Sequence, residues 1–500
     1  MSYFSVGFVL TADDDTPLGG VVDLEIVSVD GAPVLYVGSG TTGAITGLQL
    51  TAPDGPEVVT VVEADDLSGT VGLSDLVVIE HRTGDRLLAL GRYDDAPGFY
   101  DIGEAGALDL RTDFDGPEGT LARGFAGAVA EFNKSAVILG SQFNDAGFDV
   151  WKIVGNGDTR YVREMEDVRE RPLGDVGEIH VGTLKGRDIV FAASAQDDGI
   201  MAFDVDSRGA LSTLATLRSN KLDGWNNVSD LETVEIGDRA FLLVGAAGSD
   251  TISVIRVSQG GNFKLIDREE DTLFTRFGGL QDLEVIEAEN GRVFVVAAGA
   301  DDGVTLMELT ERGKLVQLET IIDGFDTTLR NVSSLETRLE GETAHVYVGS
   351  TPENGVTELL VDLSLSGDVI EGGAVAETLR GSKQDDVIWG NGMSDVLIGR
   401  AGDDRLIDGR GRDVLNGGSG DDVFEFIPDG RTDWVENFNP NRDQIDLTSF
   451  DRVYDISSIE LFPTIRGAAV KVGDDIIRLL NRDNEPFDVS RFDEDMFIFG

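Results

Sequence analysis

The chain has 500 residues and a formal net charge of −53, from 93 acidic and 40 basic residues. This balance argues against nucleic acid or an anionic membrane surface as a partner, because both would repel the protein. The chain contains no cysteine, which excludes disulfides and zinc–thiolate sites. Hydrophobic residues make up 41% of the chain and recur in apolar runs along its length, so sizeable cores are predicted rather than disorder.

The N-terminal segment MSYFSVGFVL lacks the basic region and the long apolar core of a secretory signal peptide. No stretch of about 18 or more apolar residues predicts a membrane span. We therefore expect that export, if it occurs, uses information elsewhere in the chain.

Residues 1–370 contain a repeat of about 52 residues, which is clearest in a short apolar strand that ends in a small residue. Its seven copies end at Gly38, Gly91, Gly140, Ala193, Gly245, Ala297 and Gly349. Each copy has four short strands separated by turns rich in Gly, Asp, Asn and Ser. This pattern is typical of a propeller blade, and it favours a seven-bladed β-propeller over a β-sandwich pair or an open array.

The two ends of the repeat region predict how the propeller closes. The N-terminal segment aligns with the outer strand that ends blade one, whereas blade seven has only a weak fourth strand of its own. We therefore expect residues around Phe4 to Leu10 to complete blade seven, which would remove exposed strand edges.

A second and shorter repeat fills residues 371–425, where six units of nine residues follow one another from Gly372 to Glu425 without an insertion. The sixth position of each unit is acidic: Glu377, Asp386, Asp395, Asp404, Asp413 and Asp422. The eighth position is large and apolar: Leu379, Ile388, Leu397, Leu406, Leu415 and Phe424. Glycine permits tight turns, and aspartate supplies the hard oxygen ligands that calcium prefers.

These units resemble the RTX (hemolysin-type) calcium-binding repeat. The resemblance implies a parallel β-roll in which two units make one coil and several Ca²⁺ ions lie between turns stacked two units apart. It implies these metal-site residues: Asp386, Asp395, Asp404, Asp413, Asp422, Gly399, Gly402, Gly417 and Gly420. The best site is expected between Asp404 and Asp422, and the weakest at Glu377. The alternative is a flexible, acidic, glycine-rich linker.

Residues 426–500 are predicted to form a β-rich C-terminal region. The segment DWVENFNPNRDQIDLTSF resembles the region that follows the roll in serralysin-type secreted proteins, with Asp433, Val435, Phe438, Asp443 and Ile445 at matching positions. The ending RFDEDMFIFG is similar to the ends of type I secretion substrates; the alternative, which we favour less, is a terminal strand of a β-domain. The resemblance implies a secreted, extracellular protein that uses the type I secretion machinery without a cleaved N-terminal signal peptide. No H-E-x-x-H motif occurs, so protease activity is not implied.

Acidic residues recur where the innermost strand of a blade begins: Asp23, Asp75, Glu178, Asp230 and Asp282. Blade three has Ala128 there and blade seven has Ser334. If these acids pointed toward the axis, they would form an anionic funnel for a cation or cationic ligand, which His180 could join. We favour the alternative that each carboxylate caps its own turn.

Two classes of function fit this sequence. One is a non-catalytic extracellular or surface-associated module that binds an unknown extracellular ligand. The other is a secreted propeller-type hydrolase, such as a lactonase or a calcium-dependent phosphatase. We favour the binding module, because the sequence contains no G-x-S-x-G elbow and no histidine cluster with metal-ligand spacing. Three or more acidic or histidine side chains converging on the axis would instead favour an enzyme.

Overall fold

The computed structural model describes residues 2–499 except 14, 52–54, 65–68, 112–113, 115–120, 122, 133–134, 156, 170, 196–198, 219–223, 259, 273 and 451. The chain divides into two compact units, Ser2–Val361 and Asp362–Gly500. The helices of the described residues are short 3-10 turns: η1 (Glu104–Gly106), η2 (Leu363–Leu365), η3 (Ile456–Ser458), η4 (Val489–Arg491) and η5 (Glu494–Met496). None of them is long and apolar enough to cross a bilayer.

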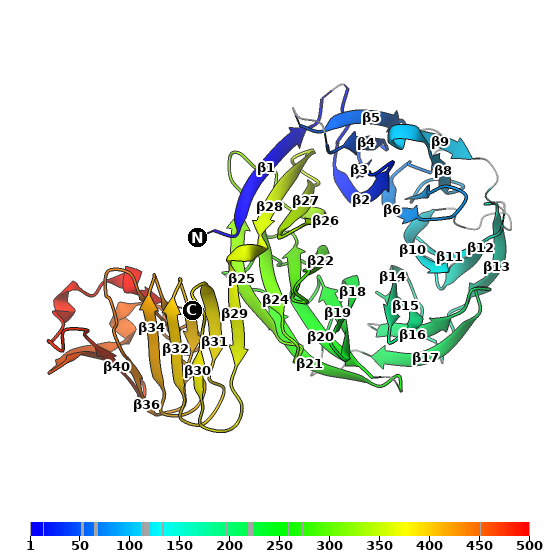
Figure 1. The fold of residues 1–500 in the computed structure, drawn as a ribbon. Helices are drawn as coiled ribbons and strands as arrows, with labels where there is room; N and C mark the ends of the chain where they lie inside the picture. The colour runs from blue at the N-terminus through cyan, green and yellow to red at the C-terminus, as the bar shows by residue number, and fades with distance from the viewer. Residues whose placement is uncertain are drawn as a thin grey trace. The chain divides into compact units, whose positions relative to one another are not determined.

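The first unit is a seven-bladed β-propeller, which confirms the predicted fold (Figure 1). Blades one to three consist of β2 (Val21–Val29), β3 (Ala32–Ser39), β4 (Ile45–Gln49), β5 (Glu57–Val62); β6 (Leu73–Ile79), β7 (Arg86–Gly91), β8 (Gly98–Ile102), β9 (Leu108–Arg111); β10 (Gly124–Phe132), β11 (Ser135–Gln142), β12 (Phe148–Ile153), β13 (Thr159–Met165). Blades four to six consist of β14 (Val176–Leu184), β15 (Arg187–Ser194), β16 (Gly199–Val205), β17 (Leu211–Arg218); β18 (Val228–Ile236), β19 (Arg239–Ala246), β20 (Thr251–Val257), β21 (Phe263–Glu270); β22 (Asp282–Glu287), β23 (Val293–Ala298), β24 (Gly303–Leu309), β25 (Leu315–Ile322).

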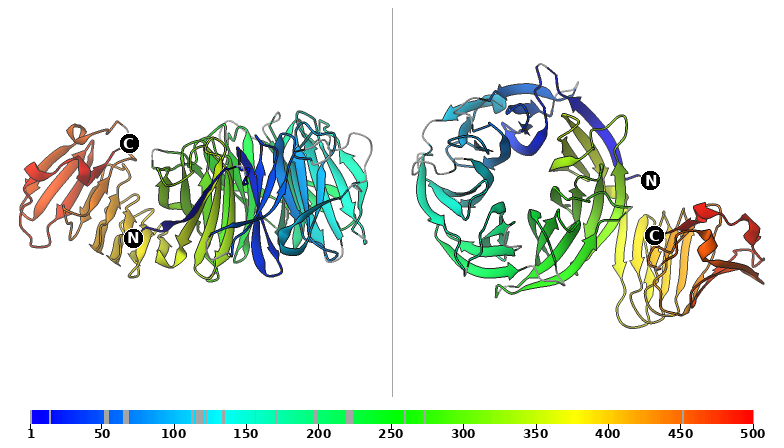
Figure 2. Two further views of the ribbon diagram at one scale, coloured as in Figure 1. Left: turned by 90° about the horizontal axis from the view of Figure 1, so that it is seen from above. Right: turned by 180° about the vertical axis from the view of Figure 1, so that it is seen from behind.

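Blade seven is built from both ends of the repeat region. It contains β26 (Val332–Glu340), β27 (Thr343–Ser350), β28 (Gly355–Asp362) and the N-terminal strand β1 (Phe4–Thr11). The strand β1 pairs antiparallel with β28, with Phe4 opposite Val361 and Thr11 opposite Gly355. The ring is therefore closed by pairing between residues more than 340 positions apart. Figure 2 (right) shows the N-terminal strand beside the last blade.

The hydrophobic core of the propeller lies between neighbouring blades. The second strand of blade five, β19, reads RAFLLVGA and is buried at seven of its eight positions. One cluster joins its Leu242 and Val244 to Phe191 and Ala193 of blade four. The outer strand β21, in contrast, reads FKLIDREE and contains no buried residue. Apolar runs thus mark strands with a blade on each face.

The second unit is a parallel β-solenoid of two sheets. One sheet consists of β29 (Ser366–Glu371), β31 (Asp385–Trp389), β33 (Arg405–Ile407), β35 (Val423–Glu425), β37 (Gln444–Asp446) and β41 (Phe497–Ile498). The other consists of β30 (Thr378–Arg380), β32 (Val396–Ala401), β34 (Val414–Ser419), β36 (Thr432–Val435), β40 (Asp475–Leu480), β39 (Gly467–Val472) and β38 (Glu460–Thr464).

Two nonapeptides make one coil of this solenoid, because strands pair in parallel at an offset of 18 residues. Leu397 pairs with Leu415, and Leu406 pairs with Phe424. Five of the eighth-position side chains, from Ile388 to Phe424, are fully or almost fully buried in a single core cluster. The apolar positions of the repeat therefore build the interior of the roll.

The solenoid continues past the last nonapeptide at Glu425. The strand β36 pairs with β34, and β37 pairs with β35, so both sheets extend into residues 426–500. Val435 and Ile445 continue the buried rows that Leu415 and Phe424 begin. The predicted β-roll (residues 371–425) and the predicted C-terminal region (residues 426–500) thus share one hydrophobic core.

Candidate functional site

The sixth-position acids form two hydrogen-bonded rows through the solenoid, each of which joins residues 18 positions apart. From Asp395 onward, Oδ1 of each aspartate accepts a hydrogen bond from the backbone N–H of the sixth-position residue two units earlier, and Asp386 accepts from Asp368 N–H in the same way. The N···O distances are 2.9 Å for Asp386 to Asp404, 3.1 Å for Asp404 to Asp422 and 2.7 Å for Asp395 to Asp413. Glu377 N–H donates to Asp395 in the same way, at 2.7 Å. We call these residues the aspartate ladder; its stacking follows the predicted pairs.

Three ladder carboxylates carry an oxygen that has no hydrogen-bond partner. The Oδ2 atoms of Asp395, Asp404 and Asp413 are buried and unsatisfied, and the exposed fraction of these residues is at most 1%. An unpaired carboxylate oxygen is costly to bury unless a cation or proton neutralises it. These oxygens are the hard ligands that Ca²⁺ uses, so the ladder fits a bound calcium ion.

The predicted site glycines lie where a side chain would collide with the ladder. A β-carbon on Gly399 would meet Oδ2 of Asp404, and one on Gly417 would meet Oδ2 of Asp422. Gly402 and Gly420 have φ angles of +114° and +157°, and a β-carbon there would strike a backbone carbonyl of the stacked turn. The glycines therefore keep space beside the carboxylates open.

Burial and mutual repulsion raise the pKa values of the ladder carboxyl groups. Burial raises the pKa of Asp404 to about 8 and the pKa values of Asp413 and Asp422 to about 7. The backbone N–H donors lower these pKa values, whereas stacked carboxylates raise them further. A cation between the turns would oppose both the desolvation and the repulsion.

The ladder continues into the tail, which sequence reasoning missed. Oδ1 of Asp433 accepts from Asp413 N–H at 2.9 Å, and Oδ1 of Asp443 accepts from Asp422 N–H at 3.4 Å. The offsets are 20 and 21 residues instead of 18, so a search in steps of nine passes over them. The signal lay in the pattern of an aspartate followed two residues later by a buried aliphatic, at Asp433–Val435 and Asp443–Ile445.

A buried group of three carboxylates lies where the repeats meet the tail. Asp408, Asp413 and Asp433 each offer an oxygen within 4.8 Å of the other two. Asp408 stands at the first position of the fifth nonapeptide, which is glycine in the other five units. Burial raises the pKa of its carboxyl to about 9, opposed by the N–H of Ile427 and reinforced by Asp433 and Asp413. Asp408 was not among the predicted site residues.

In the propeller, the predicted acids lie on the innermost strands β2, β6, β14, β18 and β22 (Figure 1). Four of them bind the inner strand of the next blade. Oδ2 of Asp23 accepts from Leu76 N–H at 2.6 Å, Asp75 from Gly127 at 2.5 Å, Asp230 from Leu283 at 2.7 Å and Asp282 from Leu335 at 2.6 Å. The favoured local cap is present at Asp23 and Asp230, whose Oδ1 atoms accept from the N–H of the following residue. The same carboxylates also join adjacent blades, which the sequence did not predict.

The axial acids (Asp23, Asp75, Glu178, Asp230 and Asp282) all have raised pKa values. Burial raises the pKa of Asp23 and of Asp230 to about 6. Burial, followed by repulsion from neighbouring carboxylates, raises those of Asp75, Glu178 and Asp282 well above the usual range. The pKa of each of these five carboxyl groups is thus raised above its usual range.

His180 contacts the next blade instead of forming a ligand set with Glu178. Its Nε2 lies 3.0 Å from Thr233 Oγ1, and its Nδ1 lies 3.6 Å from Glu232 Oε1. Burial lowers its pKa to about 4, so the imidazole is neutral at pH 7. Across the part of the chain that the structure describes, three or more acidic or histidine ligand atoms converge within 4.8 Å only at Asp408, Asp413 and Asp433. The axial convergence that would favour an enzyme is thus not found among these residues.

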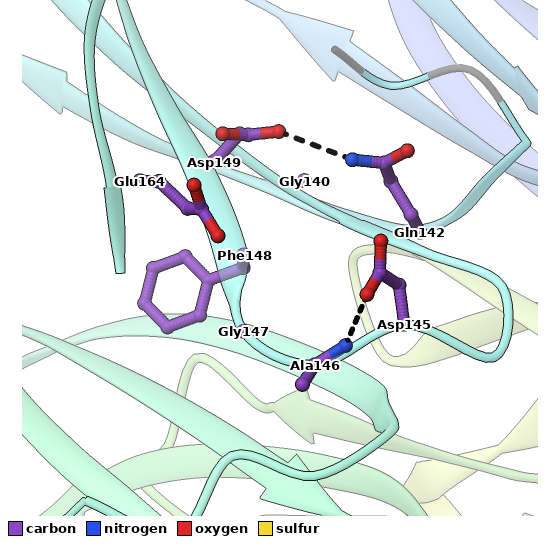
Figure 3. A pocket seen from close by; sticks show the side chains of 8 residues that line it. All are labelled: Gly140, Gln142, Asp145, Ala146, Gly147, Phe148, Asp149 and Glu164. Atoms are coloured by element: carbon purple, nitrogen blue, oxygen red, sulfur yellow. Dashed lines mark hydrogen bonds between the residues drawn. The ribbon is translucent and has the colours of Figure 1, made fainter. Parts of the chain in front are cut away.

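A small pocket lies beside the β11–β12 turn of blade three (Figure 3). Its lining includes Asp145, Asp149 and Glu164 but no histidine, lysine or arginine. Asp149 is engaged on both oxygens, because Tyr161 donates to Oδ1 at 3.0 Å and Gln142 donates to Oδ2 at 3.4 Å. The Asp149 carboxylate is therefore already bound within the blade.

The fold and the ladder together define an all-β protein that pairs a seven-bladed propeller with a solenoid suited to hard divalent cations. Residues 371–392 and 389–424 match the family model of the RTX calcium-binding nonapeptide repeat, in four copies. The chain thus carries RTX calcium-binding repeats. The search of curated proteins gave no significant match.

Two solved structures resemble the propeller. One is a protein from Lactobacillus plantarum, 15% identical, which covers 63% of this chain and 94% of its own with a TM-score of 0.44. The other is the periplasmic gluconolactonase of Pseudomonas aeruginosa, 13% identical, which covers 64% of this chain and 89% of its own with a TM-score of 0.45. Similarities this low carry no argument about the function of this chain.

Proposed function

We propose that this protein is an extracellular calcium-binding protein whose solenoid folds around several Ca²⁺ ions and whose propeller is a non-catalytic binding module. The observation that carries the proposal is the set of buried, unpartnered Oδ2 atoms of Asp395, Asp404 and Asp413. Without a cation, the stacked carboxylates repel one another and stay desolvated. Calcium binding and folding of the solenoid are therefore one event.

The expected affinity links folding to location. Extracellular calcium modules bind at roughly 10⁻⁴ to 10⁻³ M. Sites of this strength are empty at cytosolic calcium levels and filled outside the cell. The solenoid would then stay unfolded during export and fold afterwards, which suits passage through the type I secretion machinery.

Calcium titration of the full-length protein tests the central claim. We expect far-ultraviolet circular dichroism to gain β-signal and to saturate near millimolar Ca²⁺, with no comparable change in the same concentration of Mg²⁺. Magnesium is the matched control because it demands octahedral geometry at shorter distances and dehydrates reluctantly. Identical spectra with and without calcium would overturn the proposal.

The export route needs its own experiment. The full chain, expressed in a host with and without a type I exporter, should reach the medium only when the exporter is present. A variant that lacks residues 426–500 should remain in the cell. Equal amounts in the medium with and without the exporter would contradict this route and leave the calcium proposal standing.

The geometry of the axial acids supports a binding module over a hydrolase. Asp23 and Asp230 accept N–H groups from the following residue and from the next blade, so both oxygens of each are engaged in holding the ring together. A catalytic acid or base needs a free oxygen within reach of its substrate. Calcium-dependent hydrolysis of lactones or phosphate esters by the purified full chain, abolished by substitution of axial acids, would overturn this assignment.

A further inference from the structure

We propose that Asp408, Asp413 and Asp433 form a calcium site of different construction from the nonapeptide sites, one that fastens the last repeats to strand β36. It builds on the proposed calcium-dependent folding but adds a ligand, Asp408, that the repeat pattern does not contain. Asp408 precedes the turn of the fifth nonapeptide, Asp413 ends that turn, and Asp433 lies on β36.

The distances suit one shared ion. Each of the three residues brings an oxygen within 4.8 Å of the other two. Calcium–oxygen bonds are about 2.3–2.6 Å long, so two ligands of one calcium ion are at most about 5 Å apart. The three carboxylates are therefore spaced so that small side-chain adjustments would let them share one Ca²⁺.

A second and independent observation points to a ligand. Asp413 is fully buried, and its Oδ2 atom has no hydrogen-bond partner. Asp408 and Asp433 are only 2% and 4% exposed. Among the described residues, none of the three forms an ion pair with a basic side chain. The cluster thus gathers three buried carboxyl groups that have no basic side chain as an ion-pair partner among the described residues.

Backbone donors hold each carboxylate in place. Oδ1 of Asp408 accepts from Gly409 N–H at 2.5 Å and from Ile427 N–H at 2.8 Å. Oδ1 of Asp413 accepts from Asp395 N–H at 2.7 Å, and Oδ1 of Asp433 accepts from Asp413 N–H at 2.9 Å. Because one oxygen of each group is fixed, ion binding costs little reorganisation.

Three carboxylates give this site more charge than a ladder step, in which two are stacked. Calcium affinity rises with the number of charged ligands and with the rigidity of the site. We therefore expect this site to fill first as calcium rises. Its ion would join the fifth nonapeptide to β36 and so fix the start of the tail.

Asp408→Asn in the full-length protein tests the site, because asparagine keeps the Oδ1 acceptor for Gly409 and Ile427 but removes the charge. Asp474→Asn is the control, since Asp474 is an exposed acid in the same unit. Bound calcium is measured by mass spectrometry of the equilibrated protein and by isothermal titration. We expect Asp408→Asn to lose one ion per chain, or to weaken the tightest binding step at least roughly tenfold, while the control matches the wild type.

Asp408→Gly is a second variant, which restores the glycine found at this position in the other units. It should show the same loss, even if Asp408→Asn folds poorly. Unchanged ion number and affinity in both variants would overturn this inference. A wild-type protein that binds no calcium would instead overturn the proposed function, so the two failures are distinguishable.

Discussion

In the solenoid, Asp404 has one oxygen on a backbone N–H and a second, buried oxygen without a partner. In the propeller, both oxygens of Asp230 accept backbone N–H groups, from Leu231 at 2.7 Å and Leu283 at 2.7 Å. Burial raises the pKa of both carboxyls. Asp404 is almost fully buried, whereas Asp230 is only partly buried. The two carboxylates also differ in their hydrogen bonds, because only Asp404 has an oxygen without a partner.

That difference separates a cation site from a structural joint. A carboxylate with an unused, buried oxygen needs a cation or a proton to neutralise it. A carboxylate with both oxygens engaged can be held by hydrogen bonds alone. Acidic residues alone thus do not identify a candidate metal site, and the unpartnered oxygen is the more selective criterion.

Removal of calcium should give the largest difference in protease resistance between the two units. With a chelator, we expect a protease to digest residues 362–500 of the full-length protein and to leave residues 2–361 resistant, because only the solenoid depends on cations. Mass spectrometry of the fragments gives the boundary. Resistance of both units in chelator would show that the ladder is stable without a metal. The proposed difference between the two units would then be wrong.

Neutralising one ladder carboxylate should weaken calcium-induced folding. Asp404→Asn keeps the acceptor for Asp386 N–H but removes the charge on the unpartnered oxygen. We expect the calcium midpoint, followed by circular dichroism, to rise roughly tenfold, equivalent to about 1.4 kcal/mol. The exposed Asp474→Asn variant should keep the wild-type midpoint, and an equal shift in that variant would point to net charge rather than to the ladder.

The repeats made most of the fold predictable. The 52-residue spacing predicted seven blades, and the apolar eighth positions predicted the core that Ile388, Leu406 and Phe424 occupy. Both predictions rest on periodicity, which one sequence displays without knowledge of distant contacts. The offset of 18 residues between stacked aspartates follows from the same arithmetic.

What periodicity could not predict depends on contacts outside the repeat register. Asp433 and Asp443 join the ladder at offsets of 20 and 21 residues, and Asp408 replaces a glycine at a position where the pattern contains no ligand. The partner of Asp23 lies 53 residues away in the next blade, at Leu76. The local turn sequence predicts the hydrogen bond from Leu24 N–H to Asp23. It does not predict the bond from Leu76 N–H in the next blade.

Substitution of Asp230 tests the joint between blades five and six. Asp230→Ala leaves the N–H of Leu283 without its acceptor, which should lower the free energy of unfolding by about 1–3 kcal/mol. Urea unfolding of the propeller transition at saturating calcium measures this loss. Asp230→Asn keeps one acceptor oxygen and should lose less. Equal losses would mean that the charge, not the hydrogen bond, matters at this position.

The pH dependence of the propeller should reveal the protons among its inner acids. Burial raises the pKa of Asp230 to about 6 and that of Glu284 to about 8, so the folded protein holds protons that the unfolded chain releases near pH 4. Stability then falls as the pH rises from about 4 through these folded-state values.

The variant Glu284→Gln should lose less stability between pH 5 and pH 9 than the wild type. Relative to the wild type, its free energy of unfolding should be higher by roughly 1 kcal/mol at pH 9 and almost unchanged at pH 5. Thermal unfolding at both pH values measures the gain, with the exposed Glu287→Gln on the same strand as the control. A gain of equal size at pH 5 would mean that Glu284 is ionised at both pH values. Protonation of the inner-strand acids would then not explain the pH dependence.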